Sequence, residues 1–318
     1  MIDHVLVALD GSLLAECVLP HAVAIAQALD ARVTVLRAVE DSGPGFEAGV
    51  IDPLEWHMLK SEAEAYLDEV ARRLRNAGLQ TDRTLVVGEP AERIIEFARG
   101  ENVGLILLSS HGRSGLSGWN ISSVVQKVAL RAYATMMIVR AYRPAADDLA
   151  GLRYKRLLVP LNGSQRAECV LPLATQLAGF HQCRPLVAQV VDTPEMPRHV
   201  PFTEEEMALR QRLIEVNRQK GARYLEKLRS RLPADVGTRL LLSEHPAETL
   251  HDLVDEEKVD LVLLSAHGYS GSAQWPYGNT TLNFIAYGTT PLLIVQDLPW
   301  EKVGMTRAER AARELRGH

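Results

Sequence analysis

Short apolar runs typical of strands alternate along the chain with segments that have the apolar spacing of helices. This alternation occurs twice, once in each half of the chain. In the first half, short apolar runs predict strands near residues 3–9, 32–39, 81–87, 103–109 and 135–140. Segments with apolar residues every three or four positions predict helices near 13–29, 54–77, 90–99 and 121–132. The second half repeats the pattern, with strands near 156–161, 185–191, 236–242, 259–265 and 291–296. This order predicts an α/β fold with a parallel sheet covered by helices on both faces.

The two halves are copies of one unit. The stretch VLVALDGSLLAECVLPHAVAIA at residues 5–26 returns as LLVPLNGSQRAECVLPLATQLA at residues 157–178, with 13 of 22 positions identical. A second pair of segments, 105–119 and 261–275, keeps 9 of 15 positions. Self-similarity of this extent indicates a tandem duplication. We therefore expect one domain at 1–147, a second at 154–298 and a charged helical tail at 299–318.

Each domain is predicted to be a five-stranded, doubly wound parallel sheet with strand order 3-2-1-4-5. Right-handed crossovers take the chain outward from strand 1 and then back to strand 4, so the switch point lies between these two strands. Sheets of this kind bind ligands at the carboxyl ends of the strands beside the switch point. The repeated loops follow strands 1 and 4 in each half, at residues 10–12 with 109–112 and at residues 162–164 with 265–268. Two equivalent crevices are predicted.

The residues of these loops are suited to phosphate. Small side chains let backbone N–H groups approach a ligand, and the first turn of the next helix adds N–H donors with a partial positive charge. In the second half, Gly278 and Asn279 stand at a predicted helix start, where the first half has Ser122 and Ser123. A second interpretation stays open, in which the glycines form tight turns and the polar residues cap the helices.

Three motifs occur in the same order in each half. In the first half they read LDGS-xx-AE-xx-LP, VGEPAE-x-I and SSHGRSGL. With these motifs the chain resembles the universal stress protein family over nearly its whole length, twice. The resemblance implies the α/β sheet described above and, in ATP-binding members, a G-x-x-G-x9-G-[ST] motif after the fourth strand. It also implies that Asp10 or Asn162 lies near the adenine or ribose, and that the backbone of Ala38 or Val190 meets the adenine edge.

Neither half carries the family's nucleotide motif unchanged. Its positions fall on Ser109, Gly112, Ser122 and Ser123 in the first half, and on Ser265, Gly268, Gly278 and Asn279 in the second. Serine adds a Cβ atom and a hydroxyl, which is costly where the backbone turns left-handed or touches a phosphate oxygen. The second half keeps two of the three glycines, so we expect it to hold the better site. Asn162 replaces the usual aspartate, and its amide can donate as well as accept.

The resemblance therefore implies a set of nucleotide-binding residues in each half. The second half supplies Asn162, Gly163, Ser164, Val190, Ser265, His267, Gly268, Gly278, Asn279 and Thr280. The weaker first half supplies Asp10, Gly11, Ser12, Ala38, Ser109, His111, Gly112, Ser122 and Ser123. The expected ligand is ATP, with Mg²⁺ or Mn²⁺ held through the phosphates and no metal assigned to protein side chains.

No catalytic residue is assigned. His111 and His267 stand beside the crevices, but no neighbouring carboxylate pair or nucleophile completes a mechanism, so we expect these rings to hydrogen-bond their loops. Three functions remain open: a stress-response protein that binds ATP with little turnover, an interaction or scaffold module of the same fold, and a weak ATP hydrolase. The apolar last strands of the two halves are expected to pair as an intrachain pseudo-dimer, and whole chains to assemble as a homo-oligomer.

Composition narrows the class of protein. A net charge of -5 and a pI near 6.1 argue against a nucleic-acid-binding protein, which needs a clustered positive surface. No window approaches the roughly 18 apolar residues of a membrane span, and no secretory signal precedes the first strand, so a cytoplasmic location is expected. The three cysteines have no metal-ligand spacing and are expected to be buried hydrophobic residues.

Overall fold

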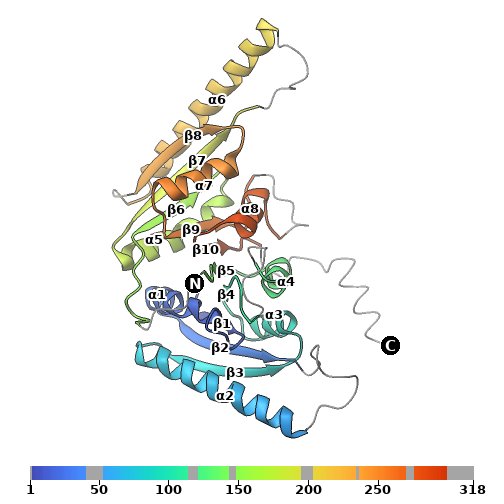
Figure 1. The fold of residues 1–318 in the computed structure, drawn as a ribbon. Helices are drawn as coiled ribbons and strands as arrows, with labels where there is room; N and C mark the ends of the chain where they lie inside the picture. Colours follow the sequence, from blue (N-terminus) through green and yellow to red (C-terminus); the bar gives the residue numbers. More distant parts are fainter. Residues whose placement is uncertain are drawn as a thin grey trace.

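The two halves share one continuous sheet. The structure is a computed structural model that describes residues 2–40, 53–113, 121–142, 148–194, 203–233, 236–269 and 276–298. Ten strands lie in the order β3-β2-β1-β4-β5-β10-β9-β6-β7-β8 (Figure 1). The tail expected at 299–318 lies outside the described residues, as do residues 143–147 at the end of the first expected domain.

The elements of the first half follow the predicted alternation. Its strands are β1 (His4–Leu9), β2 (Arg32–Val39), β3 (Thr81–Val87), β4 (Leu105–Ser109) and β5 (Met136–Val139). Its helices are the short 3₁₀ helix η1 (Ala15–Val18), α1 (Leu19–Leu29), α2 (Pro53–Asn76), α3 (Pro90–Gly100) and α4 (Ser123–Ala132).

The elements of the second half match them one for one. Its strands are β6 (Arg156–Pro160), β7 (Arg184–Asp192), β8 (Gly237–Ser243), β9 (Leu261–Ser265) and β10 (Leu292–Val295). Its helices are the 3₁₀ helix η2 (Ala167–Val170), α5 (Leu171–His181), α6 (Glu204–Arg229), α7 (Pro246–Glu256) and α8 (Asn279–Tyr287).

One predicted helix is wrong at its start. The pattern gave a single helix over residues 13–29, whereas the chain forms η1 and then begins α1 at Leu19. Pro20 explains the break, because proline has no N–H for an interior helical hydrogen bond and is tolerated only in the first turn. Pro172 has the same place in α5, so the two halves share the irregularity.

The predicted strand order is confirmed in both halves. β1 pairs in parallel with β2 and β4, and β6 pairs in parallel with β7 and β9, so each half has the order 3-2-1-4-5. β5 and β10 pair antiparallel, with Met137 opposite Leu293. The expected pairing of the last strands is therefore present, and it relates the halves as a pseudo-dimer within one chain.

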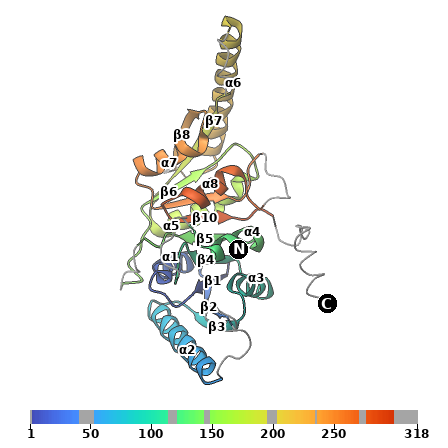
Figure 2. The ribbon, with the colours of Figure 1, turned by 45° about the vertical axis from the view of Figure 1, so that its right-hand side comes forward.

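Two apolar cores lie on opposite faces of this sheet. Alternate strand residues such as Val5 and Val7 pack with α1, α2, α5 and α6, whereas Leu6 and Leu158 pack with α3, α4, α7 and α8. Helices α1 and α5 lie side by side across the junction of the halves, as both ribbon views show (Figure 2). Each crevice beside a switch point thus has a sheet end as its floor and helices on its sides.

Among the described residues, no helix is long and apolar enough to cross a membrane.

Cys17 and Cys183 are buried as expected, but Cys169 is only half-buried. Burial raises the pKa of the Cys17 thiol to about 12, so this thiol stays protonated and behaves as a small apolar group.

Candidate nucleotide-binding cleft

The loop after the first strand of each half is a tight turn that glycine makes possible. Gly11 has φ +85° and Gly163 has φ +84°, a left-handed conformation that other residues rarely adopt. The carboxylate of Asp10 accepts from the backbone N–H of Ser12 at 2.9 Å, and Asn162 Oδ1 accepts from that of Ser164 at 3.2 Å. The sequence motif in this loop therefore has a structural role in both halves.

Ser12 and Ser164 have a second role in the turn. Their hydroxyls accept hydrogen bonds from the backbone N–H groups of Ala15 and Ala167, each at 3.1 Å, at the start of the 3₁₀ helices. The capping interpretation of the polar loop residues thus applies to these two serines.

The loop after the fourth strand is held by its own serine. Ser265 Oγ donates to the carbonyl oxygen of His267 at 2.7 Å, and Ser109 Oγ makes the equivalent bond to His111. Both serines are buried. At the first glycine position of the family motif, the replacing hydroxyl therefore stabilises the loop.

The two loops of each crevice touch, as their order in the sheet predicts. A Cβ atom on Gly268 would overlap the Asn162 amide, and one on Gly112 would overlap the Asp10 carboxylate. Any other residue at either position would displace the side chain from the strand-1 loop that packs on it. The last glycine position differs, because Gly278 has φ -79° and ψ 166°, which any residue adopts.

In the first half, Asp10 bridges the crevice. Its Oδ2 atom accepts from the backbone N–H of Arg113 at 2.5 Å, while Oδ1 accepts from the strand-1 loop. Arg37, a buried residue of β2, packs against Gly11 beside this carboxylate. Burial lowers the pKa of Arg37, and the charge of Arg113 lowers it further, whereas the charge of Asp10 acts in the opposite direction.

In the second half, the equivalent space is an open cleft of about 150 Å³. Its walls are formed by the ends of β6, β7 and β9, the start of α7 and the start of α8. Eight of the ten residues proposed for this half line it: Asn162, Val190, Ser265, His267, Gly268, Gly278, Asn279 and Thr280. The other two, Gly163 and Ser164, shape the adjacent turn.

The starts of the two equivalent helices differ at the cleft. Ser122 Oγ accepts from the backbone N–H of Val125 at 3.4 Å and so caps α4. Gly278 occupies the same position before α8, and no side chain caps that helix. The first backbone N–H groups of a helix have no partner within it, so those of α8 are available to an anion in the cleft.

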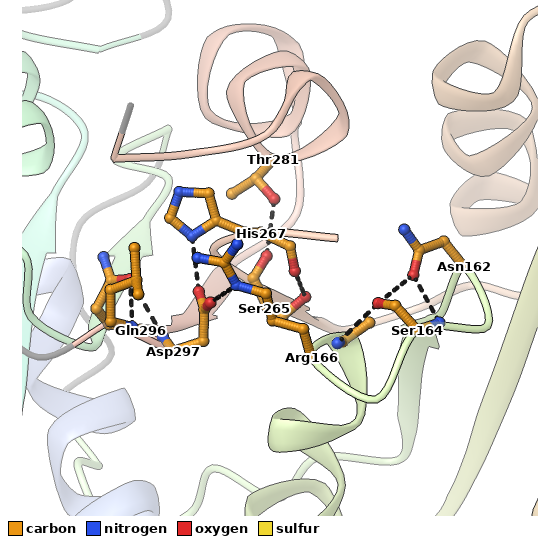
Figure 3. Close-up of polar contacts among 10 residues, drawn as sticks. Asn162, Ser164, Arg166, Ser265, His267, Thr281, Gln296 and Asp297 are labelled. Carbon is orange, nitrogen blue, oxygen red and sulfur yellow. Dashed lines mark hydrogen bonds and ion pairs between the residues drawn. The ribbon is translucent and has the colours of Figure 1, made fainter. Parts of the chain in front are cut away.

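His267 belongs to a buried ionic cluster beside the cleft (Figure 3). Its Nδ1 atom lies 2.7 Å from Oδ1 of Asp297, which follows β10, and the other oxygen of Asp297 pairs with Arg166. His111 instead contacts the Ser110 hydroxyl at 3.1 Å. The expectation that these histidines bond the loop or strand end is confirmed.

Asp297 and Arg166 were not predicted from the sequence. Their counterparts in the first half are Ala141 and Leu14, so comparing the repeats gave no signal. The apolar wall of the cleft was not predicted either, because an amphipathic pattern indicates such residues only as core: Ala188 on β7, Leu264 on β9, and Pro246 and Leu250 on α7.

The remaining first-half residues lie around the crevice that Asp10 bridges. Ala38 is half-buried in β2 beside β1, His111 and Ser109 are buried, and Ser123 is exposed at the start of α4. Within the described ranges, no group of three or more His, Cys, Asp or Glu residues has the arrangement of a metal site.

These features define a class of protein: a tandem doubly wound α/β fold with a ligand-type cleft at the second switch point. The sequence profile of the universal stress protein family matches residues 1–140 and again residues 153–296. The chain therefore belongs to the universal stress protein family, as its motifs predicted.

Individual relatives agree with this family. Universal stress protein MJ0531 of Methanocaldococcus jannaschii is 29% identical over 132 residues, which is 41% of this chain and 78% of that protein. The fold matches a universal stress protein structure from Archaeoglobus fulgidus with a TM-score of 0.63 at 18% identity, over 94% of this chain and 100% of the other. A further structure, of a universal stress protein in complex with cAMP, is 26% identical over 44% of this chain and 98% of its own, with a TM-score of 0.35.

Proposed function

We propose that this protein is a stress-response regulator that binds an adenine nucleotide, ATP, in the cleft of its second half. The observation that carries the proposal is the uncapped start of α8 in the wall of that cleft. Gly278 leaves the N–H groups of the first turn without a side-chain partner, and Asn279 and Thr280 line the same end of the cleft. A helix start with this composition favours phosphate.

The opposite end of the cleft suits the base and ribose. Ala188, Val190, Leu250 and Leu264 give it an apolar surface against which an adenine ring can pack. Asn162 is exposed at the rim and offers an amide that donates and accepts, so it can pair with a ribose hydroxyl or the edge of a base. The cleft therefore combines an apolar wall with polar groups at both ends.

A divalent ion, Mg²⁺ or Mn²⁺, accompanies the nucleotide in this proposal through the phosphate oxygens. Hard cations of this kind prefer oxygen ligands and keep several waters. The proposal includes no turnover, because the His267 ring is fully buried and bonded to Asp297.

The first half has a different role in the proposal, that of an interaction or scaffold module. Two observations favour it: Asp10 bridges the loops of that crevice, and Ser122 already occupies the start of α4. An anion there would have to displace both groups. We therefore assign one nucleotide to each chain.

We also propose domain limits of 1–147 and 154–298, a cytoplasmic setting in which ATP is abundant, and assembly of whole chains into a homo-oligomer. Antiparallel pairing of β5 with β10 uses the edge of each last strand within the chain. Contacts between chains would then involve other surfaces, such as the outer strands β3 and β8.

Two measurements test the nucleotide site. Acid extraction of the purified protein, followed by chromatography of the released small molecules, should yield adenine nucleotide. Titration calorimetry with ATP and Mg²⁺ should give one site per chain, and Gly268→Arg should abolish it while Gly112→Arg leaves it intact. A flat titration up to millimolar ATP would contradict the proposed function, and unchanged binding by Gly268→Arg would contradict the site.

A further inference from the structure

Helix α8, whose start forms the phosphate end of the proposed cleft, is held at its other end by the first half of the chain. Arg140 directly follows β5 and is buried. Its Nη2 atom donates to the carbonyl oxygen of Phe284 at 2.7 Å, and its Nη1 atom donates to that of Ile285 at 3.2 Å. Both carbonyls lie in the last turn of α8.

The guanidinium is a strong partner for this end of the helix. The last carbonyl groups of a helix lack N–H partners from a following turn and carry a partial negative charge. The Phe284 carbonyl accepts from the backbone N–H of Gly288 at 3.0 Å as well as from Arg140. Burial lowers the pKa of Arg140 to about 10, so the side chain is still charged at neutral pH. Phe284 and Ile285 are themselves buried, and without Arg140 two carbonyl groups would lose a charged donor.

The start of α8 also rests on the first half. Tyr277 immediately precedes Gly278 and is buried. Its hydroxyl donates to the sulfur of Met136 in β5 at 3.5 Å. Met136 of β5 therefore contacts the residue that precedes Gly278, and Arg140, which follows β5, contacts the last turn of α8.

The equivalent helix of the first half is held differently. Arg99 of α3 donates to the carbonyl oxygen of Arg131 in the last turn of α4 at 2.7 Å, so this cation comes from the same half. The matching position on α7, nine residues after the helix-starting proline, is Asp255, which cannot donate. In the second half, a residue from the other half supplies the missing cation.

We propose that Arg140 is a positioning residue for the nucleotide cleft, and that the first half uses it to fix the direction in which the start of α8 presents its N–H groups. This inference rests on the proposed function of the second half. Phosphate binding by backbone donors depends on their placement, because each donor must point at the ligand before it arrives. The first half thereby acts on a ligand that it does not touch.

The test compares three variants of the full chain by titration with Mg²⁺-ATP and with adenosine. Arg140→Gln introduces the residue that the chain itself has at the equivalent Gln296, and we expect about tenfold weaker ATP binding from the lost charge and hydrogen bonds. Arg140→Lys keeps the charge and should recover most of this affinity. Arg99→Gln removes the matching bond in the first half and should leave ATP affinity unchanged.

Adenosine separates positioning from a general loss of structure. Because it lacks phosphates, its affinity should be the same in the parent and in Arg140→Gln, and amide hydrogen exchange should quicken in α8 but not in α4. If Arg140→Gln does not fold, Arg140→Met takes its place, because it keeps an apolar stem and removes the charge and the donors, and an affinity for ATP equal to that of the parent overturns the inference. The inference is also overturned if Arg140→Gln binds ATP as tightly as the parent does. If the parent itself binds no ATP, the proposed function and this inference fail together.

Discussion

The Asp10 carboxylate lies directly on the Cα atom of Gly112, and Asn162 lies in the same way on Gly268. The pairs are equivalent in the repeat, but their bonds differ. Asp10 accepts from two backbone N–H groups on two loops, whereas Asn162 Oδ1 accepts from the backbone N–H and the hydroxyl of Ser164 within its own loop. In the first half, the Asp10 side chain therefore joins the two loops and stabilises the fold. In the second half, the Asn162 amide lies at the cleft.

Alanine at these two glycines should separate stability from binding. Gly112→Ala displaces a carboxylate that accepts from two backbone N–H groups and should lower the free energy of unfolding by about 1 kcal/mol, with ATP affinity unchanged. Gly268→Ala pushes Asn162 out of the cleft wall and should weaken ATP binding about tenfold, with a smaller loss of stability. Urea denaturation and calorimetry on both variants measure the two effects, and equal ATP affinities would contradict the assigned role of Asn162.

A serine at the start of α8 should have opposite effects on stability and on binding. The backbone at Gly278 accepts any residue, so Gly278→Ser can form the cap that Ser122 forms on α4. We expect a gain of a few tenths of a kcal/mol in stability. The new hydroxyl takes an N–H group that a phosphate would use, so ATP affinity should fall about tenfold. Ser122→Gly is the control, and a rise in the ATP stoichiometry to two would show that the cap alone closes the first site.

The fold was predictable because its signals are local and repeated. Apolar runs such as Leu105–Ser109 mark buried strands, and the duplication showed which loops belong to equivalent strands. Pro20 indicated that the helix over 13–29 is kinked or begins further along the chain, and the apolar pattern alone did not decide between these outcomes because it continues through the 3₁₀ turn before Pro20.

The candidate cleft was predictable only in part, for a physical reason. Residues on the repeated loops, such as Gly268 and Gly278, were found because both halves carry the same loops. Asp297 and Arg140 break the repeat, and their partners lie far along the chain or in the other half, so no spacing pattern marks them. Aligning the two halves marks residues that both halves share, so it gives no sign of contacts that only one half makes.

The buried cluster of His267, Asp297 and Arg166 should contribute strongly to the stability of the second half. Removing the Asp297 carboxylate leaves a buried imidazole and a guanidinium without their shared acceptor. Because the Arg166 side chain is 28% exposed, water can replace part of the lost pairing, and Asp297→Ala should lower the free energy of unfolding by about 1–3 kcal/mol, and the urea midpoint with it. Glu215→Ala, at an exposed pair with Arg218, is the control and should leave the midpoint unchanged. Similar midpoints for the two variants would refute the assigned role of the cluster.

His21 should make the protein less stable in mild acid. Its Nδ1 atom lies 2.7 Å from the hydroxyl of the buried Tyr154, where the two halves meet, and burial lowers its pKa to about 4. In the unfolded chain a histidine titrates near pH 6.5, so between about pH 6.5 and 4 the unfolded state binds the proton and the folded state does not. Stability should therefore fall as the pH drops through this window, by at most about 3 kcal/mol from His21.

The slope of stability against pH is the quantity to measure, because substitution also removes a hydrogen bond at every pH. His21→Leu places at this position the residue that the second half has at Leu173, so the neighbouring backbone already accepts it. Its free energy of unfolding should change less between pH 7 and pH 5 than that of the parent. Burial also lowers the pKa values of His4 and His181, so part of the slope should remain. His57→Leu, at an exposed position of α2, is the control and should keep the slope of the parent. If His21→Leu also keeps the slope of the parent, the His21 ring does not cause the loss of stability in acid.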